Sequence, residues 1–155
     1  MNIRIEDIIG RPFTFTRKPE YLPCEMRPMW RASLIILIFT LVASRTGYCS
    51  LKKIHVINWL LKSEKNANDF LFWVLNQNGV KPEVRMDPTL DRAIEILLAE
   101  GILSQENSKF KLTEKGNLFS TRLLSLDVFR KESAILEKNK KGLTETNITK
   151  LFQVG

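Results

Sequence analysis

The stretch "GILSQENSKFKLTEKG", Gly101 to Gly116, decides the fold. Two short apolar patches, 102–104 and 109–112, flank the polar segment "QENS", whose length and composition are typical of a β-hairpin loop. Gly101 is a helix stop signal, and Thr113 is a helix N-cap signal. The stretch therefore predicts a small β-hairpin between two helices.

The rest of the chain is predicted to be mainly helical, because apolar residues recur at helical spacing in several segments. Ser50 is expected to cap the second helix, and either Asp87 or Thr89 the fourth. Segment 80–88, "VKPEVRMDP", is expected to be extended because prolines bound it. The expected helices cover residues 28–44, 51–62, 66 or 68 to 77, 90–100 and 113–138.

The run "LIILIFTLVA", residues 34–43, has the hydrophobicity of a membrane helix but not the length. Arg31 and Arg45 bracket it with 13 uncharged residues between them, whereas a spanning helix needs about 20 apolar residues. A helix that is apolar all round and of this length is typical of a protein core. We therefore predict a buried central helix.

The length of 155 residues favours one domain with a single core. Residues 1–28 hold four prolines and are expected to form an N-terminal extension with a short first element at 3–9. Residues 29–138 are predicted to form the helical domain. Residues 139–155 are expected to be a basic flexible tail, or to fold only against a partner.

The formal net charge of +7 suits an anionic partner such as nucleic acid. The basic residues concentrate on the helix expected at 51–62, whose other face is apolar, and around the hairpin. A solvated surface is the alternative interpretation of the same lysines. The candidates for contact with nucleic-acid phosphates are Lys52, Lys53, Lys62, Lys109, Lys111 and Lys115.

Residues 87–106 are distinctly acidic, with five acidic residues and one basic residue. Asp87, Asp91 and Glu95 are spaced four apart and therefore share one helix face. A hydrolase or hard-metal site built on them is a remote interpretation, because a helix dipole also favours carboxylates near its N-terminus. We interpret this acidic stripe as a surface for a protein partner.

An apolar surface at Phe70 and Trp73 is a second candidate for the partner site. The chain holds three tryptophans and nine phenylalanines, which is more aromatic bulk than one small core requires. Aromatic side chains near the centre of an interface tend to dominate its binding energy.

Motifs for catalysis are missing from the sequence, which has no GxSxG, HExxH or phosphate-cradling glycine loop. It holds one histidine, His55, too few for a zinc site. Cys24 and Cys49, without CxxC spacing or a signal peptide, predict a reducing compartment. We therefore expect a cytoplasmic protein that is not an enzyme and uses no metal and no cofactor.

The tract "PTLDRAIEILLAEGILSQENSKFKLTEKG", residues 88–116, resembles the recognition-helix-plus-wing half of winged helix-turn-helix proteins of the MarR and PadR kind. The resemblance implies a mainly α fold with a small β-hairpin: a winged-helix core, an N-terminal extension and a long C-terminal helix. The long link 80–88 departs from the tight turn of that family. The helix before the wing carries Asp91, Glu95 and Glu100, which DNA phosphates would repel, and winged helices also serve as protein-interaction modules.

Taken whole, the chain resembles the small middle component of prokaryotic ABC-three-component conflict systems, which include the accessory subunit of Lamassu-type anti-phage defence. The resemblance rests on "GRPFTF", residues 10–15, on the apolar helix that begins "RPMWRASLIILIF", and on the wing. It implies a non-catalytic adaptor that docks on an SMC- or Rad50-like ATPase and couples it to an effector such as a nuclease. The alternative is a winged-helix transcription regulator.

Overall fold

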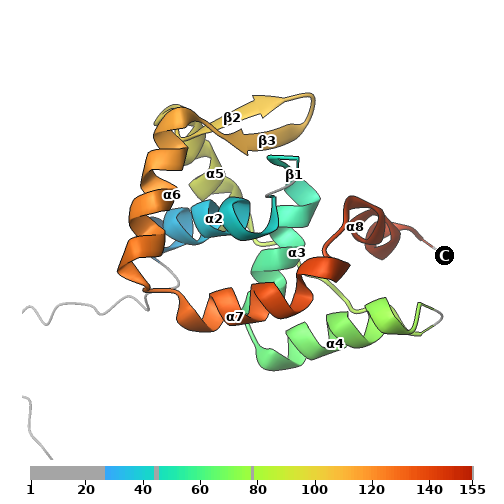
Figure 1. Cartoon of the computed structure of the whole chain (residues 1–155). Coiled ribbons are helices and arrows are strands. Elements are labelled where there is room, and N and C mark those ends of the chain that lie inside the picture. The colour runs from blue at the N-terminus through green and yellow to red at the C-terminus, as the bar shows by residue number, and fades with distance from the viewer. Residues whose placement is uncertain (1–26, 44–45, 78, 155) are drawn as a thin grey trace, which may run out of the picture.

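The computed structural model describes residues 27–43, 46–77 and 79–154. They form a mainly helical fold with a small antiparallel sheet, as predicted (Figure 1). The element expected at 3–9 and most of the extension 1–28 lie outside the described residues. The elements are α2 (Pro28–Val42), β1 (Tyr48–Ser50), α3 (Leu51–Leu61), α4 (Glu64–Leu75), α5 (Pro88–Ala99), β2 (Leu103–Glu106), β3 (Lys109–Leu112), α6 (Glu114–Leu126), α7 (Arg130–Asn139), the 3-10 helix η2 (Lys140–Gly142) and α8 (Glu145–Phe152).

Polar side chains fix where several helices begin. The side-chain oxygens of Ser50, Asp87 and Thr113 each accept a backbone N–H in the first turn of α3, α5 and α6, respectively. These three N-caps are therefore confirmed. Ser63 caps α4 in the same way, which is why α4 begins at Glu64, before the expected residue 66 or 68.

The three strands are ordered β1-β3-β2. The hairpin of β2 and β3 is confirmed, but its turn is shorter than the expected "QENS" loop. Asn107 and Ser108 have φ angles of 47° and 64°, the left-handed pair whose twist suits a two-residue hairpin turn. β1 lies between the helices expected at 28–44 and 51–62, and its Cys49 pairs with Phe110 of β3. Three residues are too few to show a strand pattern in the sequence.

α2 lies at the centre of the fold and contributes to two hydrophobic clusters (Figure 1). Leu34 and Ile38 pack with α3, α4, α7 and α8, which we call the helical half. Ile35 and Phe39 pack with α5 and the sheet, which we call the sheet half. Residues 34–39 are all buried, so the prediction of a buried central helix is confirmed. Within the described ranges, no helix has both the length and the apolar character to cross a membrane.

The expected basic face on α3 is wrong, because the helix is buried on every side from Lys53 to Leu60. α2, α4, α7 and α8 all contact it, and they cover the side that was expected to face solvent.

Burial also raises the pKa of the Cys49 thiol, just before α3, to about 11. The Cys49 thiol is therefore protonated at neutral pH, and it forms no disulfide.

The single long helix expected at 113–138 is also wrong. Asp127 adopts a left-handed conformation, with φ 51°, and ends α6. Phe129 then turns into the core, where its ring centroid lies 5.7 Å from that of Trp30 on α2. α7 consequently runs back across the helical half instead of continuing the direction of α6 (Figure 1).

The segment 139–155, expected to be a flexible tail, folds in its described part. η2 and α8 carry Leu143 and Ile148 into the core of the helical half. Thr144 caps α8 by accepting the backbone N–H of Asn147. The high lysine content of the segment concealed an amphipathic helix, because most of these lysines precede α8, which itself carries only Lys150.

Candidate functional site

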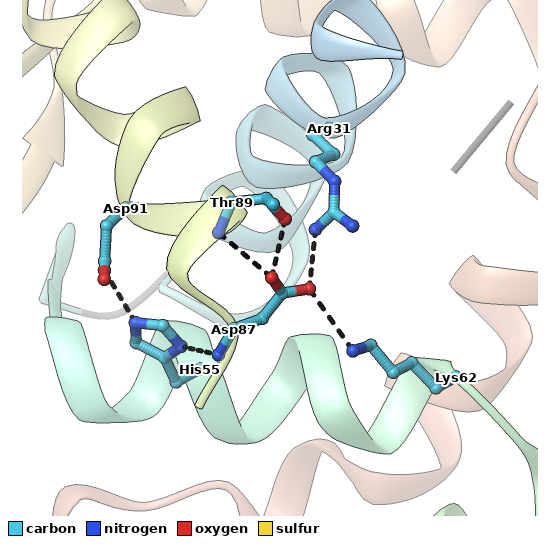
Figure 2. Close-up of polar contacts among 6 residues, drawn as sticks. All are labelled: Arg31, His55, Lys62, Asp87, Thr89 and Asp91. Carbon is cyan, nitrogen blue, oxygen red and sulfur yellow. Dashed lines mark hydrogen bonds and ion pairs between the residues drawn. The ribbon is translucent and has the colours of Figure 1, made fainter. Parts of the chain in front are cut away.

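A polar cluster ties α2, α3 and the start of α5 together (Figure 2). Oδ2 of Asp87 accepts hydrogen bonds from Arg31 Nη1 at 3.0 Å and from Lys62 Nζ at 3.2 Å. Oδ1 accepts the backbone N–H of Thr89 at 3.0 Å and its hydroxyl at 2.6 Å. One carboxylate therefore caps α5 and pairs with cations from two other helices.

The environment of Asp87 keeps its carboxylate ionised. Burial by itself raises the pKa of Asp87, because the charged form loses hydration. Hydrogen bonds from the side chain and backbone of Thr89 and from Lys62, together with the charge of Arg31, outweigh that effect. The net result is a pKa well below the ordinary value for aspartate.

His55, on α3, bonds to two residues at the start of α5 (Figure 2). Its Nδ1 accepts the backbone N–H of Asp87 at 3.3 Å, and its Nε2 lies 2.8 Å from Oδ1 of Asp91. Because Nδ1 accepts, the ring proton lies on Nε2, which donates to Asp91. The sequence does not reveal this role, because both partners of His55 lie more than 30 residues away in the chain.

The acidic stripe expected to bind a partner divides into a structural part and an exposed part. The Asp87 side chain is only 13% exposed and both of its oxygens are occupied, so it is not available to a partner. Asp91 is half exposed and bonded to His55. Glu95 is the most open of the three and lies 4.0 Å from Arg92. The described residues include no group of three or more His, Cys, Asp or Glu side chains that could hold a metal ion.

The expected apolar surface at Phe70 and Trp73 is wrong, because both side chains are in the core of the helical half. Their ring centroids lie 6.1 Å apart. α7 packs against this face of α4, which leaves Phe72 and Leu75 on the outer face. The aromatic bulk noted in the sequence therefore fills a core that the C-terminal segment enlarges.

Three of the six candidate lysines are committed to contacts within the fold. Lys53 is buried in α3 and presents no surface to a nucleic acid. Lys62 donates to Asp87. Lys115 Nζ donates to the backbone carbonyl of Glu100 at 2.9 Å and so satisfies a group at the end of α5.

Of the other three lysines, two lie near aromatic rings and one is exposed at the hairpin. Lys52 Nζ lies 5.5 Å from the ring centroid of Phe152 on α8. Lys111 Nζ lies 5.4 Å from the ring centroid of Tyr48, its cross-strand partner on β1. Lys109 begins β3 beside the hairpin turn and is exposed. Lys109 and Lys111 thus keep their charges near the sheet, while Lys52 lies against α8.

α6 packs on α2 and β3 and leaves several large apolar side chains exposed. Its buried residues are Gly116 and Ser120, and the Ser120 hydroxyl lies 2.7 Å from that of Thr40 on α2. A Cβ atom at position 116 would collide with the backbone carbonyl of Ile102. Its exposed large apolar side chains are Leu118, Phe119, Leu124 and Leu126. Leu118, Phe119 and Leu126 lie within about 100° of one another around the helix axis, and we call these three the α6 face.

The sequence does not reveal the α6 face, because these side chains fit the helical period of the single long helix expected at 113–138. The signal that locates the buried side is the pair of small residues at 116 and 120, four apart on one side of the helix. Small residues permit close approach between helices and strands, so the larger apolar residues are left on the outer side.

Comparisons with protein-family models, with curated proteins and with solved structures give no match. The surfaces described above are therefore the basis for assigning a function.

Proposed function

We propose that the chain is a non-catalytic adaptor that docks on a protein partner through the α6 face. Exposed apolar patches on soluble proteins often mark interaction sites. Leu118 and Leu126 are 71% and 67% exposed. They lie eight residues apart and therefore share one side of the helix. The α6 face is the single observation that carries the proposal.

The proposed partner is an SMC- or Rad50-like ATPase of a prokaryotic anti-phage defence complex, which the adaptor couples to an effector. The resemblance to the middle component of ABC-three-component systems supports this choice. Leu118, Arg122 and Leu126 form a stripe with a cation between two leucines. Such a stripe complements a coiled-coil helix whose apolar seam is flanked by acidic residues.

The order of the elements supports a winged-helix core for this adaptor. The chain supplies, in this order, a helix (α2), a strand (β1), two helices (α3 and α5) and two strands (β2 and β3). The strands are ordered β1-β3-β2 in the sheet. α4 and the link 79–87, which holds no helix or strand, stand between α3 and α5. In this assignment α5 is the equivalent of the recognition helix, and the two-residue turn at Asn107 and Ser108 is the tip of the wing.

The alternative, a winged-helix transcription regulator, has one observation in its favour: Lys109 and Lys111 lie on the hairpin, where they could contact phosphates. The outer side of α5 argues against it, because Arg92 is accompanied by Glu95 and Glu100. A salt titration of DNA binding separates the two functions. A nanomolar preference for one palindromic site would favour the regulator, whereas weak binding that ignores sequence favours the adaptor.

The adaptor is tested by a pull-down with the tagged SMC- or Rad50-like ATPase encoded beside it. We expect the double variant Leu118→Asp, Leu126→Asp to lose capture, because charges would have to be buried in the interface. The matched control is Phe72→Asp, Leu75→Asp on α4, where two apolar side chains of similar exposure lie on a different surface. Circular dichroism of each variant checks that the fold is retained.

The possible outcomes separate the parts of the proposal. Loss of capture only in the α6 variant supports docking through α6. Equal capture of both variants removes the α6 face from the interface, and loss only in the α4 variant moves the interface to α4. Failure of the wild type to be captured contradicts the adaptor function itself.

A further inference from the structure

A pocket of about 430 Å³ opens between α2, α3 and α7, and no residue of α6 lines it. This volume lies in the range of small-molecule sites. Apolar side chains line part of it, Trp30 among them, and charged side chains line the rest. Neither the adaptor proposal nor the core packing assigns a role to this pocket.

Three cations from three helices reach the pocket. Arg31 comes from α2, Lys62 from the end of α3 and Lys131 from α7. Arg31 and Lys62 share one oxygen of Asp87, so their two charges are balanced by a single carboxylate there (Figure 2). Glu132 is the acidic residue of the lining, which leaves an excess of one positive charge. That excess favours an anionic ligand.

A buried amide gives the pocket a second recognition element. Asn58 lines the pocket and is only 4% exposed. Its Nδ2 has no hydrogen-bond partner among the described residues. A buried polar group without a partner is unfavourable, and a ligand atom that bonds to it removes the penalty. An asparagine amide offers both a donor and an acceptor, a combination that matches the edge of a nucleobase.

Trp30 supplies a flat aromatic surface at the same site. Phe129 packs on its ring at an interplanar angle of 64°, which holds the indole in place. Aromatic side chains next to cations are the usual means by which proteins bind a base and its phosphate together. We propose that this pocket binds a nucleoside monophosphate, with the phosphate near Arg31, Lys62 and Lys131 and the base between Trp30 and Asn58.

The same chemical group occurs as a free nucleotide and at the 5′ end of a strand. Isothermal titration calorimetry of the full chain, with the four ribonucleoside monophosphates and a 5′-phosphorylated trinucleotide as probes, distinguishes the two sources. We expect at least one probe to bind with a Kd below about 1 mM. Inorganic phosphate and the unphosphorylated nucleoside should each bind at least about tenfold more weakly, since each lacks one half of the group.

Variants test whether the binding occurs in this pocket. Lys131→Ala, at an exposed lysine, should weaken binding by about tenfold, whereas Lys138→Ala, on the same helix outside the lining, should not. Asn58→Leu should weaken binding and also raise the melting temperature, because it removes a buried amide without a partner. Weaker binding together with a higher melting temperature would show that Asn58→Leu removes a ligand contact and does not damage the fold.

The proposal is overturned if no probe binds at millimolar concentration, or if inorganic phosphate binds as tightly as the best nucleotide. Binding that Lys131→Ala and Asn58→Leu leave unchanged would place the ligand elsewhere and would also overturn it. The α6 face takes no part in these measurements, so the adaptor proposal is tested independently.

Discussion

The two halves of the molecule are built from different kinds of sequence. The sheet half is largely one continuous stretch, in which α5, β2 and β3 follow one another from Pro88 to Leu112. The helical half joins α3 and α4 to α7 and α8, which are separated from them by more than 50 residues. Patterns of neighbouring residues therefore predict the elements of the sheet half well. The helical half instead depends on contacts between segments that are far apart in the chain.

The largest change in stability is expected from deletion of residues 143–155. This deletion tests whether the helical half depends on a segment far away in the chain. We expect the deletion to cost about 3–6 kcal/mol, because it removes the buried side chains of Leu143 and Ile148 at roughly 1.5–3 kcal/mol each. Such a loss is comparable with the whole stability of a small domain. Urea unfolding of the deletion variant measures it.

The matched control is Val154→Ser, at a fully exposed residue in the same segment. It should leave the unfolding midpoint within experimental error. If the deletion is as mild as this control, the C-terminal segment is a flexible tail after all, and the core of the helical half is smaller than described.

The next test concerns Asp87, which ties the sheet half to α2 and α3. Asp87→Ala removes an N-cap, worth about 1 kcal/mol, and leaves Arg31 and Lys62 without their shared carboxylate. We expect a total loss of about 2–4 kcal/mol. Glu95→Ala, on the exposed side of the same helix, should change the stability by less than about 0.5 kcal/mol. Equal effects of the two variants would show that the cluster does not join the halves.

The charge of Asp87 also predicts a pH dependence. Its pKa in the folded state lies below the unfolded value of about 3.9, so its stabilising effect is complete above that value and is lost as the pH falls toward the folded pKa. Asp87→Asn keeps a capping side chain but lacks the charge. The difference in unfolding free energy between wild type and Asp87→Asn should therefore stay constant above about pH 5 and shrink as the pH falls from about 5 to about 2. A constant difference would contradict the lowered pKa.

A smaller change in stability is expected at Gly116, where the start of α6 packs against the sheet half. Alanine usually stabilises a helix relative to glycine by about 1 kcal/mol. At Gly116 we expect the opposite sign, a loss of about 1–2 kcal/mol, because the new Cβ would meet the carbonyl of Ile102. Asn117→Ala, one residue later and exposed, should be neutral or stabilising. Thermal unfolding of both variants measures the contrast, and a more stable Gly116→Ala would refute the close contact.

The sequence predicts features that depend on neighbours in the chain. The caps Ser50, Asp87 and Thr113 were identified because a cap needs only the first turn that follows it. The break at Asp127 was not identified, because a non-glycine residue in the left-handed region is held there by the packing of Phe129 further on. Three residues of β1 gave no periodicity of their own.

The candidate site was less predictable than the fold, because exposure depends on which helices meet. Phe70 and Trp73 belong to an amphipathic pattern that is identical whether the apolar side faces a core or a partner. The sequence predicts Lys53 to be a surface residue, because nothing in it shows that α8 contacts α3. Only the small residues Gly116 and Ser120 carry local information on which side of α6 is buried.

The smallest expected effects concern the lysines near the sheet. Lys115→Ala removes a hydrogen bond to the exposed end of α5 and should cost about 0.3–1 kcal/mol in urea unfolding. Because its ammonium is already engaged, we expect this variant to leave the salt dependence of any non-specific DNA binding unchanged. Lys109→Ala should instead lower the slope of log K against log salt by about 1, as loss of one phosphate contact requires. Equal slopes for Lys109→Ala and the wild type would remove Lys109 from contact with DNA, and with it half of the observation that favours a regulator.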